Sequence, residues 1–134
     1  MDLQLQGRTA LVTGASVGIG RGIARALAAE GVRLAVTARR ADKLEELARE
    51  IVAAGGAPPL PIVQDMVADD AAARIAKAAL DGLGSVDILV NNAGGSRSFK
   101  DLHVSEEQWQ EAMTLNFHRP RQMGDALIDQ MIAR

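Results

Sequence analysis

The segment Thr13-Gly14-Ala15-Ser16-Val17-Gly18-Ile19-Gly20 joins two stretches of different character. Before it, residues 8–13 (RTALVT) form an apolar run that predicts a strand, and after it apolar side chains recur at helical spacing up to Glu30. Its glycines are separated by three residues and then by one, a spacing that differs from both the GxGxxG fingerprint and the Walker loop. Glycine lets the backbone turn sharply and approach a ligand closely, and the free N–H groups of a following helix attract an anion. The segment therefore predicts a phosphate-binding turn; the alternative is a strand-to-helix turn that uses glycine only for its geometry.

The rest of the chain repeats the same alternation of strand and helix. Apolar runs predict strands at 8–13, 32–37, 60–63 and 86–90. Helical patterns follow each of them, at 19–30, 41–54, 68–81 and from Ser105 almost to the end. This alternation is typical of an α/β fold with a parallel sheet covered on both faces, and right-handed crossovers make that sheet doubly wound. We expect one domain over residues 1–134.

Composition excludes several classes of function. The 134 residues carry 15 basic and 17 acidic side chains, a formal charge of −2, which argues against a nucleic-acid binder. The chain has no cysteine, so disulfides, zinc–thiolate sites and thiol nucleophiles are excluded, and we expect His103 and His118 to bind no metal. We expect a cytoplasmic protein without a membrane partner, because no signal peptide is apparent and no apolar run reaches the roughly 18 residues that a membrane span needs.

Two basic residues follow the predicted second strand. In a dinucleotide-binding fold, an acid about 20 residues after the glycines bonds the adenosine ribose and selects NAD. Here Arg39 and Arg40 stand at that place, and the next acid is Asp42. Guanidinium groups suit a 2′-phosphate, so the sequence favours NADP (as NADPH) over NAD. The alternative is that these arginines begin a helix and lie in solvent.

Four signals together resemble the short-chain dehydrogenase/reductase family, from Leu5 to the end of the chain. They are the TGxxxGIG turn at 13–20, Asp65 after the third strand, Asn91-Asn92-Ala93-Gly94 after the fourth, and Asn116 in the last helical region. The resemblance implies a Rossmann-like sheet of order 3-2-1-4, the first four of the family's seven strands.

The resemblance also implies roles for individual residues. The glycine turn would line the pyrophosphate, Arg39 would meet the 2′-phosphate, Asp65 and Met66 would flank the adenine, and Asn92 to Gly94 would pack beside the ribose. Asn116 would be catalytic, ordering a water in a proton relay. The expected cofactor-binding residues are Gly14, Ser16, Val17, Gly18, Ile19, Gly20, Arg39, Arg40, Asp65, Met66, Asn92, Ala93 and Gly94.

Structural roles are open for several of the same side chains. Asn91 and Asn92 could be turn residues, since asparagine tolerates left-handed backbone and bonds locally. Asp65 could help to cap the third helix at its N-terminus. Asn116 could bridge backbone groups at a helix kink.

The remaining catalytic residues that the family implies are a serine, a tyrosine that donates a proton, and a lysine four residues after it. This chain contains no tyrosine, and Ser96, Ser98 and Ser105 lie too early to replace the serine. We therefore expect the N-terminal half of an NADP(H)-dependent oxidoreductase of the carbonyl reductase or alcohol dehydrogenase type, inactive by itself. Its parent would act on a small-molecule carbonyl or alcohol as a homo-oligomer, and the fourth strand would be an open edge. A non-catalytic NADP-binding or partner-recruiting module, and a split enzyme completed in trans, are the alternatives.

Overall fold

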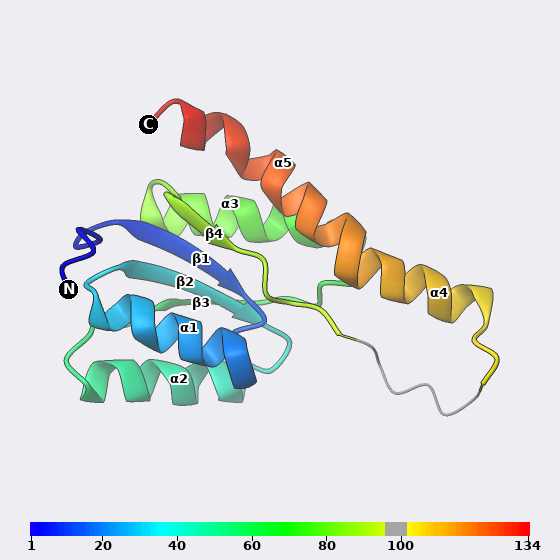
Figure 1. Cartoon of the computed structure of the whole chain (residues 1–134), viewed down its shortest axis with the longest axis horizontal. Helices are drawn as coiled ribbons and strands as arrows, with labels where there is room; N and C mark the ends of the chain where they lie inside the picture. Colours follow the sequence, from blue (N-terminus) through cyan, green and yellow to red (C-terminus); the bar gives the residue numbers. More distant parts are fainter. Residues whose placement is uncertain (96–101) are drawn as a thin grey trace.

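The computed structural model describes residues 1–95 and 102–134. Within them the strands form one parallel sheet, which confirms the predicted order 3-2-1-4 (Figure 1). The strands, in chain order, are β1 (Thr9–Thr13), β2 (Arg33–Ala38), β3 (Leu60–Val63) and β4 (Ile88–Val90). Because all four run in the same direction, their carboxyl ends meet at one edge of the sheet, where α/β folds bind ligands.

Helices cover both faces of the sheet, as Figure 1 shows. The helices are α1 (Gly18–Ala29), α2 (Ala41–Ala53), α3 (Ala71–Leu83), α4 (Glu106–Met113) and α5 (Arg119–Ile132). Side chains alternate across β1: Ala10 and Val12 pack in a core with α1 and α2, whereas Leu11 packs in a second core with α3 and α5. The doubly wound arrangement is therefore confirmed, because a parallel sheet needs apolar cover on both faces.

The fourth strand is shorter than residues 86–90, the range that the apolar run predicts. Val86 is fully buried, but its main chain bonds a side chain of α5: its N–H donates to Oε1 of Gln130 (3.2 Å) and its carbonyl accepts from Nε2 (2.7 Å). Ladder pairing with β1 begins only at Ile88. β4 is the outer strand of the sheet that the described residues form, and its residues are only partly buried.

The last helical region is not one continuous helix. Ser105, where the sequence predicts the helix to start, is the N-cap residue of α4, and it forms a reciprocal capping box with Gln108 in which each side chain accepts from the backbone N–H of the other residue. A π-helical segment, η1 (Thr114–His118), then separates α4 from α5. Such segments often mark functional sites, and this one contains Asn116.

The third helix begins at Ala71 rather than at the predicted Ala68, because residues 65–68 form a turn in which the N–H of Ala68 donates to the carbonyl of Asp65 (3.2 Å). None of the helices in the described part of the chain is long and apolar enough to cross a membrane.

Candidate functional site

The glycine turn places backbone, not side chains, next to the end of β4. Gly14 has φ +65°, and a Cβ at this position would lie 2.8 Å from the Cα of Ala93. Gly14 therefore needs to be glycine for both its conformation and its close approach to a second backbone. Gly18 opens α1 with φ +61°, and a Cβ there would meet nothing within 4 Å. The space beside the first residue of this helix is therefore open.

Gly20 serves the packing of the turn. A Cβ here would lie 2.3 Å from the carbonyl oxygen of Gly14 and 2.4 Å from Nδ2 of Asn92. Only glycine lets α1 approach both groups, and Gly20 is buried. The structure thus explains this glycine by helix packing.

A hydrogen-bond network around Thr13 joins the glycine turn to the end of β4. The Thr13 hydroxyl accepts from the N–H groups of Asn92 (3.1 Å) and Ala93 (2.9 Å) and donates to the carbonyl of Val90 (3.3 Å). Asn92 Nδ2 donates to the carbonyl of Gly14 at 3.0 Å. Because this side chain bonds the backbone of the turn after β1 rather than its own turn, Asn92 connects two parts of the site.

These segments surround a cavity of about 460 Å³, a volume in the range of small-molecule sites. The segments that follow all four strands contribute to it, together with the last two residues of β2. It brings together many of the residues singled out from the sequence, namely Gly14, Ser16, Val17, Ile19, Arg39, Asp65, Met66, Asn92, Ala93 and Gly94. It also includes residues that the sequence analysis missed, namely Thr37, Ala38, Gln64, Gly95 and Leu115.

A signal for some of the missed residues was present in the sequence. Thr37, Ala38 and Gln64 stand at the carboxyl ends of predicted strands, where a parallel sheet binds its ligands. Leu115 has no such signal, because its place depends on how η1 packs. Gly18, Gly20, Arg40 and Asn116 are not among the lining residues of this cavity.

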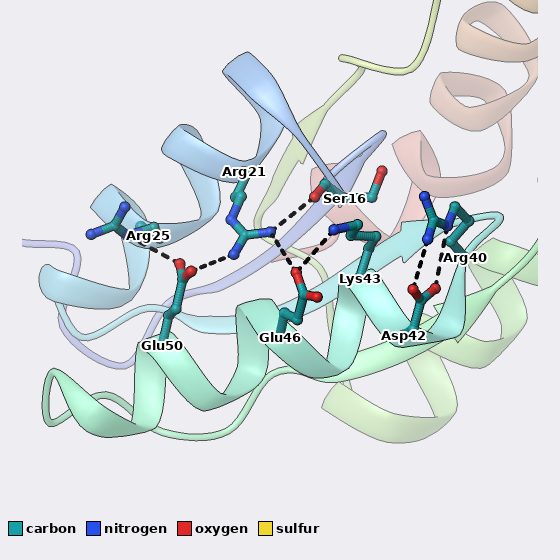
Figure 2. Close-up of polar contacts among 8 residues, drawn as sticks. All are labelled: Ser16, Arg21, Arg25, Arg40, Asp42, Lys43, Glu46 and Glu50. Carbon is teal, nitrogen blue, oxygen red and sulfur yellow. Dashed lines mark hydrogen bonds and ion pairs between the residues drawn. The ribbon is translucent and has the colours of Figure 1, made fainter.

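The two arginines after β2 have different surroundings. Arg39 lines the cavity, and no carboxylate of the described residues pairs with its guanidinium. Arg40 is the N-cap residue of α2, and its guanidinium pairs with Asp42 at 2.8 Å (Figure 2). The hydrogen bond from Arg40 lowers the pKa of the Asp42 carboxyl. For Arg40, the structure agrees with the alternative of a helix-starting residue in solvent.

An ion-pair network holds the glycine turn from the side of α2 (Figure 2). Arg21, in the first turns of α1, donates from Nη1 to the carbonyl of Ser16 (3.2 Å) and pairs with Glu46 and Glu50 of α2. Arg25 and Lys43 extend the network, pairing with Glu50 and Glu46 respectively. The hydrogen bond from Arg21 lowers the pKa of the Glu50 carboxyl. Arg21 therefore restrains the backbone of Ser16, a role that the sequence analysis missed although Glu46 and Glu50 stand four residues apart on a predicted helix.

The loop after β3 presents Asp65 and Met66 to the cavity. The Asp65 carboxylate accepts from the N–H of Val67 at 3.0 Å, and Met66 is buried. The N-cap position of α3 belongs to Asp70, so the alternative role of Asp65 in capping that helix is wrong. Its carboxylate instead stabilises the turn in which it lies.

Asn116 bridges two backbone segments. Its Oδ1 accepts from the N–H of Gly95, and its Nδ2 donates to the carbonyls of Gly95 and Ala112, each at 2.8 Å. The expectation of a bridge at a helix irregularity is confirmed. The side chain lies beside the cavity, since Gly95 and Leu115 both line it.

The serines and histidines considered in the sequence analysis form no further candidate site within the described residues. Ser105 is used as the helix cap, and Ser96 and Ser98 lie outside the described residues. His103 is exposed and His118 packs edge-on against Phe117. Residues 1–95 and 102–134 contain no group of three potential metal ligands.

Known proteins match this chain over almost its whole length. L-xylulose reductase from Bos taurus is 37% identical over 134 residues, which is 100% of this chain and 51% of that protein. The crystal structure of L-sorbose reductase from Gluconobacter frateurii, complexed with NADPH and L-sorbose, has a TM-score of 0.92 at 31% identity and covers 100% of this chain and 51% of that one.

A metagenomic short-chain oxidoreductase, solved in complex with NADP, has a TM-score of 0.88 at 41% identity, with 96% and 58% of the two chains covered. The chain spans about half the length of the curated relatives it matches. The family model for short chain dehydrogenases matches residues 8–134, which include the glycine turn, the four strands and Asn116. The chain belongs to the short chain dehydrogenase family.

Proposed function

We propose that residues 1–134 form the nucleotide-binding domain of an NADP(H)-dependent oxidoreductase that interconverts a small carbonyl compound and an alcohol by hydride transfer. The observation that carries this proposal is the cavity at the carboxyl ends of the four strands, which places the glycine turn, Arg39, Asp65 and Asn92 around one space. Two solved relatives hold NADPH or NADP, which supports a nicotinamide nucleotide as the ligand. The bound nucleotide would supply the hydride, and the residues below would hold it.

The turn between β1 and α1 suits a pyrophosphate. The N-cap residue of α1 is Val17, whose side chain cannot accept a hydrogen bond, and the helix starts with Gly18-Ile19-Gly20. The N–H groups of this first turn therefore lie beside small or apolar side chains and the open space at Gly18, where a phosphate oxygen could accept from them. In this proposal Gly14, Ser16 and Ile19 line the pyrophosphate, while Gly20 keeps the helix close to the turn.

Arg39 would select NADP over NAD. Its exposed guanidinium lines the cavity without a competing carboxylate from the described residues, so it can donate to a 2′-phosphate. The pairing of Arg40 with Asp42 leaves Arg39 as the main phosphate-binding arginine in our proposal. Asp65 and Met66 would flank the adenine, and Asn92, Ala93 and Gly94 would pack beside the adenosine ribose.

The proposed catalytic residue on this chain is Asn116, which would order a water for proton transfer. From the described residues its Oδ1 accepts one hydrogen bond, that of Gly95, which leaves its second lone pair for that water. A general acid contributes about 10²–10⁴-fold to such reactions, and this chain has no tyrosine to provide one. We therefore propose that the 134 residues alone bind nucleotide without turnover. The exposed apolar side chains of Trp109, Met113 and Phe117 support the homo-oligomer that we also propose.

The missing tyrosine favours a second function, a non-catalytic module that binds NADP or recruits a partner. The continuation of the reading frame separates the two. A Tyr-x-x-x-Lys motif roughly 25 to 40 residues after Arg134 would put both side chains on one helix face and exclude the module. If the motif instead occurs on another polypeptide, mixing the two chains and following NADPH consumption would identify an enzyme completed in trans.

Isothermal titration calorimetry tests the nucleotide site directly. The protein, expressed from its complete reading frame, should bind NADPH more tightly than NADH. A folded sample that binds neither nucleotide would overturn the proposal, and equal affinities would remove the NADP assignment while leaving the site.

A further inference from the structure

Arg119, the first residue of α5, is a buried arginine. Its relative exposure is 6%, whereas Arg121, two residues later, lies on the surface. Each nitrogen of its guanidinium donates a hydrogen bond: Nε to the carbonyl of Met66 (2.8 Å), Nη2 to the carbonyl of Val67 (3.1 Å) and Nη1 to Oε1 of Gln122 (2.8 Å). The planar guanidinium is well suited to two carbonyls on one loop, because its donors are held at fixed angles.

This arrangement is costly as a packing device. The carboxylate nearest to Arg119 among the described residues is that of Asp69, at 3.8 Å from Nη2, and it is fully exposed to solvent. The buried charge is therefore balanced mainly by carbonyl dipoles. Burying an ion costs several kcal/mol, and an apolar side chain of similar volume often stabilises a protein more. Arg119 therefore contributes little to the stability of the fold. We infer that its role is to fix the position of the loop whose carbonyls it bonds.

The loop that Arg119 holds forms one wall of the cavity. Asp65 and Met66 line the cavity, and Arg119 bonds the carbonyl of Met66 and that of the residue after it. Arg119 itself is not one of the lining residues. It follows η1 directly, and η1 contributes Leu115 to the cavity and bonds Gly95 through Asn116. One side chain thus connects the loop after β3 to the helical segment that contributes Leu115 to the cavity.

We propose that Arg119 is a positioning residue of the nucleotide site, which holds the carbonyls of Met66 and Val67 and thereby sets the place of Asp65 and Met66 against the adenine. This inference rests on the proposed function. It adds a dependence of adenine binding on a residue that does not touch the nucleotide. In the proposed binding mode Asp65 and Met66 of this loop flank the adenine, so we expect loss of Arg119 to weaken binding of the adenosine half.

The test compares Arg119→Met and Arg119→Lys with Arg121→Met in the protein expressed from its complete reading frame. Met has similar length without donors, whereas Lys keeps the charge but cannot donate to the two carbonyls from a rigid fork. The ligands are 2′,5′-ADP, which carries the adenosine half, and nicotinamide mononucleotide, which carries the other half. Binding is measured by calorimetry well below the unfolding midpoint of each variant.

We expect the dissociation constant for 2′,5′-ADP to rise by about tenfold in Arg119→Met and by less in Arg119→Lys, consistent with the loss of charge-assisted hydrogen bonds. The dissociation constant for nicotinamide mononucleotide should not change in either variant. Arg121→Met should bind both ligands with the affinity of the wild type. If a folded Arg119→Met or Arg119→Lys variant binds 2′,5′-ADP like the wild type, or if both halves weaken equally, Arg119 has only a structural role and the inference fails. If the wild type itself binds no 2′,5′-ADP, the proposed function is wrong, and the inference that rests on it is overturned with it.

A measurement on the wild type covers the case in which the substitutions prevent folding. Nitrogen-15 NMR follows the hydrogen exchange of individual arginine Nε–H groups. Binding of 2′,5′-ADP should slow the exchange of the Arg119 Nε–H, because the ligand stabilises the loop that accepts this hydrogen bond. The Arg121 Nε–H serves as the control. Equal exchange at Arg119 with and without the nucleotide would overturn the inference.

Discussion

Asn92 Nδ2 donates a hydrogen bond of 3.0 Å to the carbonyl of Gly14, joining the end of β4 to the turn after β1. These residues are 78 positions apart in the sequence. The glycine turn thus takes its shape from two strands of the sheet and from the approach of α1 at Gly20. Substitutions that disturb the contacts among the glycine turn, the end of β4 and α1 should lower both the stability of the protein and its affinity for nucleotide.

Gly20→Ala should destabilise the protein by about 2 kcal/mol or more, because the added Cβ would meet the carbonyl of Gly14 and the amide of Asn92. Gly22→Ala is the matched control in the same helix: a Cβ there meets nothing within 4 Å, and alanine should stabilise the helix by about 0.5–1 kcal/mol. Urea unfolding gives the free energy of unfolding of the two variants and of the wild type. Equal effects of the two substitutions would contradict the packing role of Gly20.

Thr13→Val should cost about 1–3 kcal/mol, because it removes a buried hydroxyl that accepts from Asn92 and Ala93 and leaves their N–H groups without this partner. Thr37 is its neighbour in the β1–β2 ladder and equally buried, but its hydroxyl has no hydrogen-bond partner in the described part of the chain. Thr37→Val should therefore be neutral or stabilising. Chemical denaturation gives the free energy of unfolding of the two variants. A larger loss of stability in Thr37→Val than in Thr13→Val would contradict the role given to the Thr13 hydroxyl.

Arg39→Ala should weaken NADPH binding by about tenfold or more and leave NADH binding unchanged, because only NADPH carries the 2′-phosphate that a guanidinium would bond. Arg40→Ala should change either affinity much less, since Arg40 already pairs with Asp42. The four dissociation constants can be measured by calorimetry. An equal loss for both nucleotides in Arg39→Ala would show that the arginine does not recognise the extra phosphate.

Asp87 should contribute stability that depends on pH. The N–H of Thr9 donates to its carboxylate (3.0 Å), and this hydrogen bond, with the Arg134 guanidinium at 2.9 Å, lowers the pKa of Asp87 below its ordinary value of 3.8. Because the folded pKa is the lower one, this stability is fully present above pH 3.8 and is lost as the pH falls through the folded pKa.

Asp87→Asn should therefore cost about 1–2 kcal/mol at neutral pH, and the difference from the wild type should narrow as the pH falls below 3.8. Urea titrations between neutral and acid pH measure this. Asp81→Asn is the control, because Asp81 is exposed and its one ion pair within residues 1–95 and 102–134 is with Lys77 on the same helix, a solvent-exposed contact that stabilises little. A difference for Asp87→Asn that stays constant with pH would contradict the prediction.

The doubly wound fold and most of the residues around the cavity could be predicted from the amino-acid sequence. Both follow from local patterns: apolar runs predict the strands, and the carboxyl ends of parallel strands must meet at one edge, so residues after each strand come together. The capping box at Ser105 was readable in the same way, because it depends on residues three positions apart.

Which of these side chains line the cavity depends on how distant segments pack and could not be predicted from the sequence. Arg39 and Arg40 are adjacent and chemically alike, but Arg39 lines the cavity whereas Arg40 is the N-cap residue of α2 and pairs with Asp42. The burial of Arg119 depends on the loop after β3, more than 50 residues away in the chain. Contacts of this kind form when segments far apart in the sequence pack together. A sequence pattern within one helix or strand therefore cannot predict them.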